Sequence, residues 1–115
     1  MVAPPATDFR GPYARHVAAY EFEGEVYLWR GDQASGTFVD LPQDLSDEVE
    51  DARVVAPGGF GALRVEVTIG RTTWRTSLFP SKERATFVLP VKKAVMRAEG
   101  LEHGDRVRVG FSLVG

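Results

Sequence analysis

Residues 63–79, LRVEVTIGRTTWRTSLF, set the fold class of this 115-residue chain. Apolar side chains occupy every second position from Leu63 to Ile69, which is the period of a half-buried β-strand. Gly70-Arg71 fits a two-residue hairpin loop, and Thr72 to Phe79 fits the return strand. The sequence therefore predicts an antiparallel hairpin inside a β-rich domain.

Similar alternation predicts further strands on both sides of this hairpin. They cover residues 18–30, 37–41, 85–89 and 106–113. Gly24 lies within the first of them and predicts a bulge or a sharp bend, as small barrels need. About six strands, spaced as hairpins, are typical of a small, mostly antiparallel β-barrel.

Two short helices are expected to cap this barrel, each near a Leu-Pro pair. The first runs from Pro42 to about Ala52, with Asp44 or Ser46 as its N-cap. The second has Pro90 in its first turn and ends at Gly100. Its predicted core side consists of Val91, Ala94, Val95 and Ala98, and its outer side of Lys92, Lys93, Met96 and Arg97.

Both halves of the chain show the same order of elements: strand, Leu-Pro, short helix and long alternating strand. Leu41-Pro42 and Leu89-Pro90 lie 48 residues apart, with negligible residue identity around them. This indicates a repeated, pseudo-duplicated architecture. Because one chain with two such halves can close a barrel alone, we expect a monomer.

The composition excludes several classes of protein. With 43% hydrophobic and 26% charged residues, the chain is typical of a single globular domain. It has no cysteine, which removes disulfides, thiolate metal sites and cysteine nucleophiles and favours a reducing cytoplasm. No apolar run reaches the roughly 18 residues of a membrane helix. Residues 1–17, rich in proline, are expected to be a flexible tail before one domain over residues 18–115.

The charge is unevenly distributed along the chain. The formal net charge is −2, but residues 21–51 hold ten acids and one base, whereas residues 53–97 hold nine bases and two acids. One interpretation is that opposite charges on one small domain neutralise each other. The other is a basic side that meets an anion such as nucleic acid.

Few residues are arranged for catalysis or metal binding. His16 lies in the expected tail and His103 in a turn with Asp105, and no serine has the context of a nucleophile. Three alternate glutamates within residues 21–25 share one strand face, which favours a solvated surface. The sequence therefore predicts no catalytic residue, no metal and no cofactor.

Five basic residues are the candidates for binding an anion. They are Arg71 and Arg75 on the hairpin and Lys92, Lys93 and Arg97 on the second helix. They form one patch only if closure of the barrel brings hairpin and helix together.

Trp29 and Trp74 admit two interpretations. Aromatic side chains in a small barrel belong to its core by default. The alternative is that they line a pocket, where a tryptophan can stack on a nucleobase.

A series of short motifs from Tyr20 to Val109 supports a family assignment. They are Trp29, Phe38-Val39, Leu41-Pro42, Arg64-Val65, Thr68-Ile69-Gly70, Arg75 to Pro80, Leu89 to Val95, Gly100-Leu101 and Gly104-Asp105 with Val107. In these residues the chain resembles the bacterial family known as domain of unknown function 1905. The resemblance implies a double-split β-barrel, the fold also of the swapped-hairpin transition-state regulators, and it implies no activity.

The chain departs from that family at two places. Ser81-Lys82-Glu83-Arg84 stands where the family tends to have glycines. Met96 stands where it tends to have an arginine, although Arg97 is adjacent. Any role of that arginine is therefore not transferred to Met96.

Three functions are considered, in order of preference. The first is a non-enzymatic β-barrel module that binds an unknown ligand as a cytoplasmic monomer. The second is a nucleic-acid-binding regulator, which predicts a dimer and one contiguous basic face. The third is an enzyme acting on a small anionic substrate, which predicts a deep pocket containing His103 or a buried carboxylate.

Overall fold

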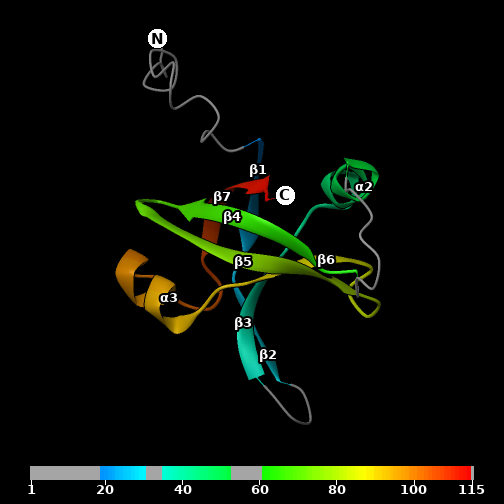
Figure 1. Cartoon of the computed structure of the whole chain (residues 1–115). Coiled ribbons are helices and arrows are strands. Elements are labelled where there is room, and N and C mark those ends of the chain that lie inside the picture. Colours follow the sequence, from blue (N-terminus) through cyan, green and yellow to red (C-terminus); the bar gives the residue numbers. More distant parts are fainter. Residues whose placement is uncertain (1–18, 31–34, 53–60, 115) are drawn as a thin grey trace, which may run out of the picture.

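In the part of the chain that the structure describes, the alternating segments form a mainly β structure in which seven strands make one curled sheet, accompanied by two helices (Figure 1). The computed structural model describes residues 19–30, 35–52 and 61–114. The predicted tail lies outside the described residues. The elements are β1 (Tyr20–Glu25), β2 (Tyr27–Arg30), β3 (Ser35–Asp40), α2 (Gln43–Ala52), β4 (Leu63–Ile69), β5 (Thr72–Ser81), β6 (Thr86–Pro90), α3 (Lys93–Glu99) and β7 (Arg106–Leu113).

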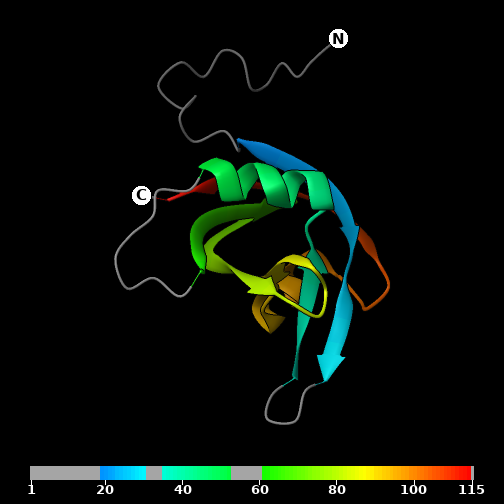
Figure 2. The ribbon, with the colours of Figure 1, turned by 90° about the vertical axis from the view of Figure 1, so that its right-hand side faces the viewer.

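The order of the strands explains why the sheet curls. It is β1-β7-β4-β5-β6-β3-β2, and every neighbouring pair is antiparallel. β1 and β2 stand at opposite ends of this order, yet only Val26 separates them in the chain. The sheet must therefore bend round on itself, and Figure 2 shows it as a half-barrel.

Val26 is the point at which the first long strand changes partner. Its N–H donates to the carbonyl of Asp105 at 2.9 Å, and its carbonyl accepts from the N–H of Gly104 at 2.7 Å. Before it β1 pairs with β7, and after it β2 pairs with β3. The single strand predicted over residues 18–30 is thus two strands, which is why the sheet has seven strands rather than about six.

Helix α2 packs on β6 through a residue that was expected to cap it. Ser46 is buried inside the helix, and its Oγ accepts a hydrogen bond from the N–H of Phe87 at 3.1 Å. The prediction of Ser46 as N-cap is therefore wrong, because this hydroxyl serves a backbone donor of the sheet. Val49, one turn further on, is fully buried as expected.

The start of α3 also differs from the prediction. Pro90 is the last residue of β6 and pairs with Phe38. The N–H of Val91 donates to the carbonyl of Thr37 at 2.8 Å, so the chain stays extended beyond the proline and the helix begins only at Lys93. In an antiparallel pair only every second residue hydrogen-bonds to the neighbouring strand. Pro90 occupies a position that does not bond to β3, so its lack of an N–H leaves no carbonyl of β3 without a donor.

The buried face of α3 also differs from the predicted one. Val95 is buried and Met96 packs against the core, whereas Ala94 and Ala98, both expected inside, are exposed. The predicted placement of Met96 on the outer side is therefore wrong. Gly100 ends the helix in the left-handed conformation, with φ 63°, as predicted.

β3 and β6 are related by a local two-fold pattern of hydrogen bonds. Around the pair Val39 and Leu89, the N–H of Leu41 donates to the carbonyl of Phe87 as the N–H of Val91 donates to that of Thr37. The helices that follow begin at Gln43 and Lys93, which are 50 positions apart. The Leu-Pro pairs, 48 apart, are thus displaced by two residues from the structural equivalence.

The core lies inside the curl of the sheet. Its fully buried side chains come from most of the strands and from both helices, and they are Phe111, Leu78, Leu89, Val26, Val39, Val49, Val65, Val67, Val95 and Val109. These strands and α3 together fix the walls of the grooves described below.

Candidate anion-binding grooves

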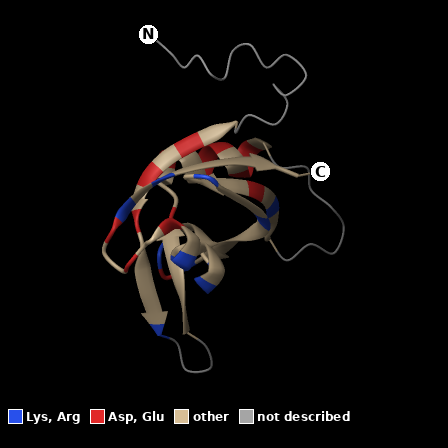
Figure 3. Ribbon diagram, turned by 90° about the vertical axis from the view of Figure 1, so that its left-hand side faces the viewer, with Lys and Arg blue, Asp and Glu red and all other residues tan. Residues whose placement is uncertain are grey.

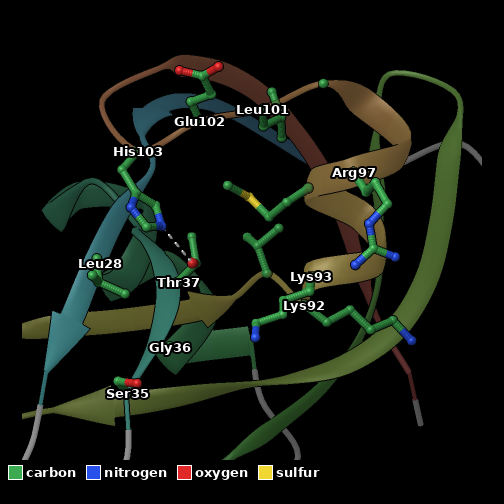
Figure 4. Close-up of a pocket in the computed structure, with 13 residues that line it drawn as sticks. Leu28, Ser35, Gly36, Thr37, Lys92, Lys93, Arg97, Leu101, Glu102 and His103 are labelled. Atoms are coloured by element: carbon green, nitrogen blue, oxygen red, sulfur yellow. Dashed lines mark hydrogen bonds between the residues drawn. The ribbon is translucent and has the colours of Figure 1, made fainter.

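One groove, here called the α3 groove, lies between α3, β3 and the loop that follows α3. It has a volume of about 700 Å³. Its apolar lining consists of Leu28, Val91, Met96 and Leu101. Figure 4 shows Lys92, Lys93 and Arg97 on one side of this groove and the pair Thr37 and His103 facing them.

The three basic side chains of the α3 groove are not neutralised locally. Lys92, Lys93 and Arg97 are exposed, and within the described ranges none of them forms an ion pair with a carboxylate. Glu102 also lines the groove and is the acid among its described lining residues. The lining therefore carries a net positive charge that favours an anion.

A second groove, here called the β5 groove, adjoins the first. It has a volume of about 440 Å³, and Trp74, Arg75 and Thr76 of β5 and Phe38 of β3 contribute to its lining. The two grooves have Ser35, Gly36, Thr37, Val91 and Lys92 in common. They therefore form one continuous surface with Lys92 at the junction.

Arg75 is only loosely held beside this junction. Its Nε lies 3.7 Å from Oε2 of Glu66, and its side chain is 61% exposed. An exposed pair at this distance contributes little to stability, so the guanidinium remains able to turn towards a ligand.

The fold thus brings four of the five predicted basic residues to adjoining grooves, and Arg71 is the exception. Arg71 is exposed in the turn between β4 and β5, where its backbone N–H donates to Oε2 of Glu99 at 3.2 Å. It lines neither the α3 groove nor the β5 groove. Ligand binding by any of the five residues stays a prediction.

The two tryptophans lie in different grooves. Trp74 is half-buried, packs against the core and lines the β5 groove. Trp29 is also half-buried and lines a third groove, of about 400 Å³, between β2 and the end of β5. Phe79, 46% exposed, stands in this third groove, here called the aromatic groove, together with Phe38.

A polar cluster that the sequence analysis missed borders the aromatic groove. The hydroxyl of Tyr27 donates to Oδ1 of Asp40 at 2.6 Å. Nε and Nη2 of Arg84 lie 2.9 and 2.8 Å from Oδ2 of Asp40, and the guanidinium sits 4.3 Å above the ring of Tyr27. Burial, followed by the hydrogen bond to Asp40, raises the pKa of the Tyr27 hydroxyl above its usual value. No sequence pattern indicates this cluster, because Arg84 is 44 positions from Asp40.

The distribution of charge agrees in part with internal neutralisation. Arg108 and Arg106 of β7 lie 3.5 and 4.0 Å from Glu21 and Glu23 of β1. Figure 3 shows acids along β1 and α2 and basic residues on α3, which faces the viewer. Glu21 and Glu23 of β1 are therefore paired with β7, whereas the basic residues of α3 form no ion pair with a described carboxylate.

His103 lies at the rim of the α3 groove, and no carboxylate of the described residues forms a hydrogen bond or ion pair with its ring. Its Nε2 is 3.2 Å from the hydroxyl of Thr37. Oδ2 of Asp105 accepts a hydrogen bond from the N–H of Glu102, so this carboxylate fixes the predicted turn. Among the residues with described positions no group of three or more His, Asp or Glu could hold a metal ion. In the same part of the chain no helix is long and apolar enough to span a bilayer.

Comparison with known proteins assigns the chain to a family. The sequence model described as "Domain of unknown function (DUF1905)" matches residues 22–110, which include both tryptophans and all five basic candidates. The chain is a member of the DUF1905 family. A search of curated proteins finds no match to it.

The two departures of this DUF1905 chain lie in contrasting surroundings. Met96, where the resemblance led us to expect an arginine, packs against the core, and Arg97 beside it lines the α3 groove. In the turn after Phe79-Pro80, Ser81 Oγ accepts a hydrogen bond from the N–H of Arg84. Ala85 closes this turn with φ 60°, a conformation that glycine adopts more readily.

Proposed function

We propose that this DUF1905 chain is a non-enzymatic binding module whose ligand is an anion held across the α3 and β5 grooves. The observation that supports this most strongly is the convergence of Arg75 from β5 with Lys92, Lys93 and Arg97 from α3 and its N-terminal flank. Separate elements contribute these charges to one concave surface, and the three on the α3 side have no carboxylate partner among the described residues.

The shape of the grooves supports the same proposal. Their volumes of about 700 and 440 Å³ lie in the range of roughly 300–1,000 Å³ that ligand sites occupy. Apolar side chains such as Met96 and Leu101 line the larger groove together with its basic residues. A ligand with an apolar body and a negative group matches both features.

Binding without catalysis is supported by the surroundings of His103. A histidine that activates a hydroxyl needs a third group to orient its ring, and the described partner of His103 is the Thr37 hydroxyl alone. In the described part of the chain the buried polar residue is Ser46, and no carboxylate is buried. The described residues therefore provide no buried carboxylic acid that could serve as a general acid.

We also propose that the half-barrel is a double-split β-barrel and that the protein acts as a cytoplasmic monomer. β5 pairs first with β4 and then with β6, just as β1 and β2 pair in turn with β7 and β3. This equivalence supports two repeated halves in one chain, which need no second chain to complete the sheet. The absence of cysteine supports the cytoplasm.

The test is binding to labelled short single-stranded RNA and duplex DNA, measured by fluorescence anisotropy at increasing salt concentration. We expect affinity to fall with salt, because each phosphate contact releases counterions. In the Lys92→Ala/Lys93→Ala variant the slope of log affinity against log salt is expected to be smaller by about 1.4 for a single strand.

A matched control removes two positive charges elsewhere. Arg64 and Lys82 are exposed and line neither of the two grooves. The Arg64→Ala/Lys82→Ala variant should keep the parent slope. Absence of binding at low salt, or equal weakening in both double variants, contradicts the proposal.

A further inference from the structure

We infer that the anion held in these grooves is a single strand of nucleic acid, with an unpaired base stacked on Trp74 and the phosphates on the α3 cations. This rests on the proposed function and adds the chemical class of the ligand. The inference is carried by the position of Trp74 in the wall of the β5 groove, which is continuous with the groove lined by the basic side chains of α3.

The β5 groove offers a surface for a base. Trp74 is half-buried: it packs against the core and also contributes to the groove wall. Phe38 and Pro90, which pair across β3 and β6, line the same groove. A rigid aromatic ring held by the core loses little entropy on stacking, and every nucleobase has a face that can stack.

The basic side chains lie on the same continuous surface as this aromatic wall. Arg75 shares the β5 groove with Trp74, Lys92 lines both grooves, and Lys93 and Arg97 follow in the α3 groove. Phosphates recur along a nucleic-acid strand, so a strand with one base on Trp74 presents its next phosphates to these residues. The hydroxyl groups of Ser35 and Thr37 line the shared part and can hydrogen-bond to phosphate or sugar oxygens.

Both properties favour a single strand over a duplex. In a duplex the faces of the bases are covered by their neighbours, so Trp74 would have no partner and only the cations would bind. A small inorganic anion would likewise use the cations and leave Trp74 unused. The contribution of the base therefore separates this inference from anion binding in general.

The experiment compares strands with and without bases. Oligothymidylate, oligouridylate and an abasic deoxyribose-phosphate strand, each of about ten nucleotides, are titrated into the Trp29→Phe protein. The chain has two tryptophans, so the fluorescence of this variant reports on Trp74. We expect the strands with bases to quench that fluorescence and to bind about 5- to 100-fold tighter than the abasic strand. The two strands with bases reveal whether RNA or DNA is preferred.

Variants of the aromatic wall provide the second readout. The Trp74→Leu variant should bind strands with bases no tighter than the abasic strand, and Trp74→Tyr should restore part of this difference in affinity. The Trp29→Leu variant, changed in the aromatic groove, should show the same difference in affinity as the parent. Because Trp74 packs against the core, the comparison of strands in the Trp29→Phe protein stands even if Trp74→Leu fails to fold.

The outcomes distinguish the two proposals. Equal binding of abasic and base-containing strands, without quenching, overturns the inference and leaves anion binding intact. Absence of binding by every strand overturns both.

Discussion

Gly24 lies close to the buried side chain of Val39, just before the first long strand changes partner. A Cβ at Gly24 would meet Cγ1 of Val39 at 2.7 Å and Cε2 of Phe22 at 3.5 Å. Valine is stiff about χ1 and cannot swing aside. We expect Gly24→Ala to lower the free energy of unfolding by about 1–3 kcal/mol, as overpacked cores do, measured by urea denaturation.

Gly36→Ala is the matched control for this substitution. Gly36 is also in a strand, and a Cβ there would make an ordinary contact of 3.4 Å with Phe38. We expect Gly36→Ala to change the free energy of unfolding by less than about 1 kcal/mol, because alanine also lowers the conformational entropy of the unfolded chain. Equal losses in both variants would show that the Val39 contact is not the cause.

Tyr27 should make the stability of the protein depend on alkaline pH. Burial and the hydrogen bond to Asp40 raise the pKa of its hydroxyl in the folded state above the value near 10 of an unfolded chain. The folded state therefore holds this proton more tightly, and the stability it contributes is lost as the pH rises above about 10. Urea denaturation between pH about 9 and 11 should show a steeper fall in the parent than in Tyr27→Phe. Parallel curves for the two proteins would refute this role.

Local sequence could predict single residues only where their partners are local. Gly100 as a helix end and Asp105 as a turn residue were predicted because both act within a few positions. Tyr27, Asp40 and Arg84 meet only because β2, β3 and β6 are neighbours in the sheet. No spacing in the sequence encodes that order.

The carboxylate of Glu99 connects helix α3 to the β4–β5 turn by hydrogen bonds. Oε2 of Glu99 accepts a hydrogen bond from the hydroxyl of Thr72 at 2.5 Å and one from the N–H of Arg71 at 3.2 Å. A Cβ at Gly70 would overlap this carboxylate, so the glycine permits the approach. We expect Glu99→Ala to destabilise the protein by about 1 kcal/mol in urea denaturation.

A double-mutant cycle of Glu99→Ala with Thr72→Val measures the interaction free energy between these two side chains. The two substitutions remove the same hydrogen bond, so their effects should sum to more than that of the double variant by about 0.5 kcal/mol or more. Glu83→Ala, an exposed acid in the turn after β5, should not couple to Thr72. Strict additivity for Glu99 and Thr72 would mean that the contact contributes nothing.

The elements themselves were largely predictable, and their ends and faces were not. The alternating stretch of β4 was predicted with its observed bounds, because a half-buried strand carries its own period. Pro90 and Met96 were misplaced because pairing of β6 with β3 keeps the chain extended past the proline and turns α3. The Leu-Pro pairs indicated that the two halves repeat. They are 48 positions apart, whereas the equivalent helices begin 50 positions apart, because the chain stays extended beyond Pro90.

Across the whole molecule, the candidate site depends on strand order more than on any motif. The sequence identified Arg75, Lys92, Lys93 and Arg97 as basic and Trp74 as ambiguous. It could not show that β5 and α3 meet beside β3, or that Arg71 is directed elsewhere, because loop lengths and periodicity do not determine tertiary neighbours. The separation of Trp29 from Trp74 has the same origin.

Glu102 provides a test of the net charge of the site. It lines the α3 groove opposite in sign to Lys92, Lys93 and Arg97. Removing its charge reduces repulsion of an anion, so Glu102→Gln should tighten binding of a single strand by about 2- to 5-fold at low salt, with the gain lost at high salt. Anisotropy titrations at two salt concentrations measure this, and weaker binding in the variant would place the anion elsewhere.

The most direct test of the central claim, that the α3 and β5 grooves are the binding surface, is chemical-shift mapping of the ¹⁵N-labelled protein with an oligothymidylate. We predict saturable shifts at the amides of Thr37, Lys92 and Arg97 and at the indole N–H of Trp74, with the amides of β1 and α2 unmoved. Shifts concentrated on β1 and α2, or no shifts at low salt, would contradict it.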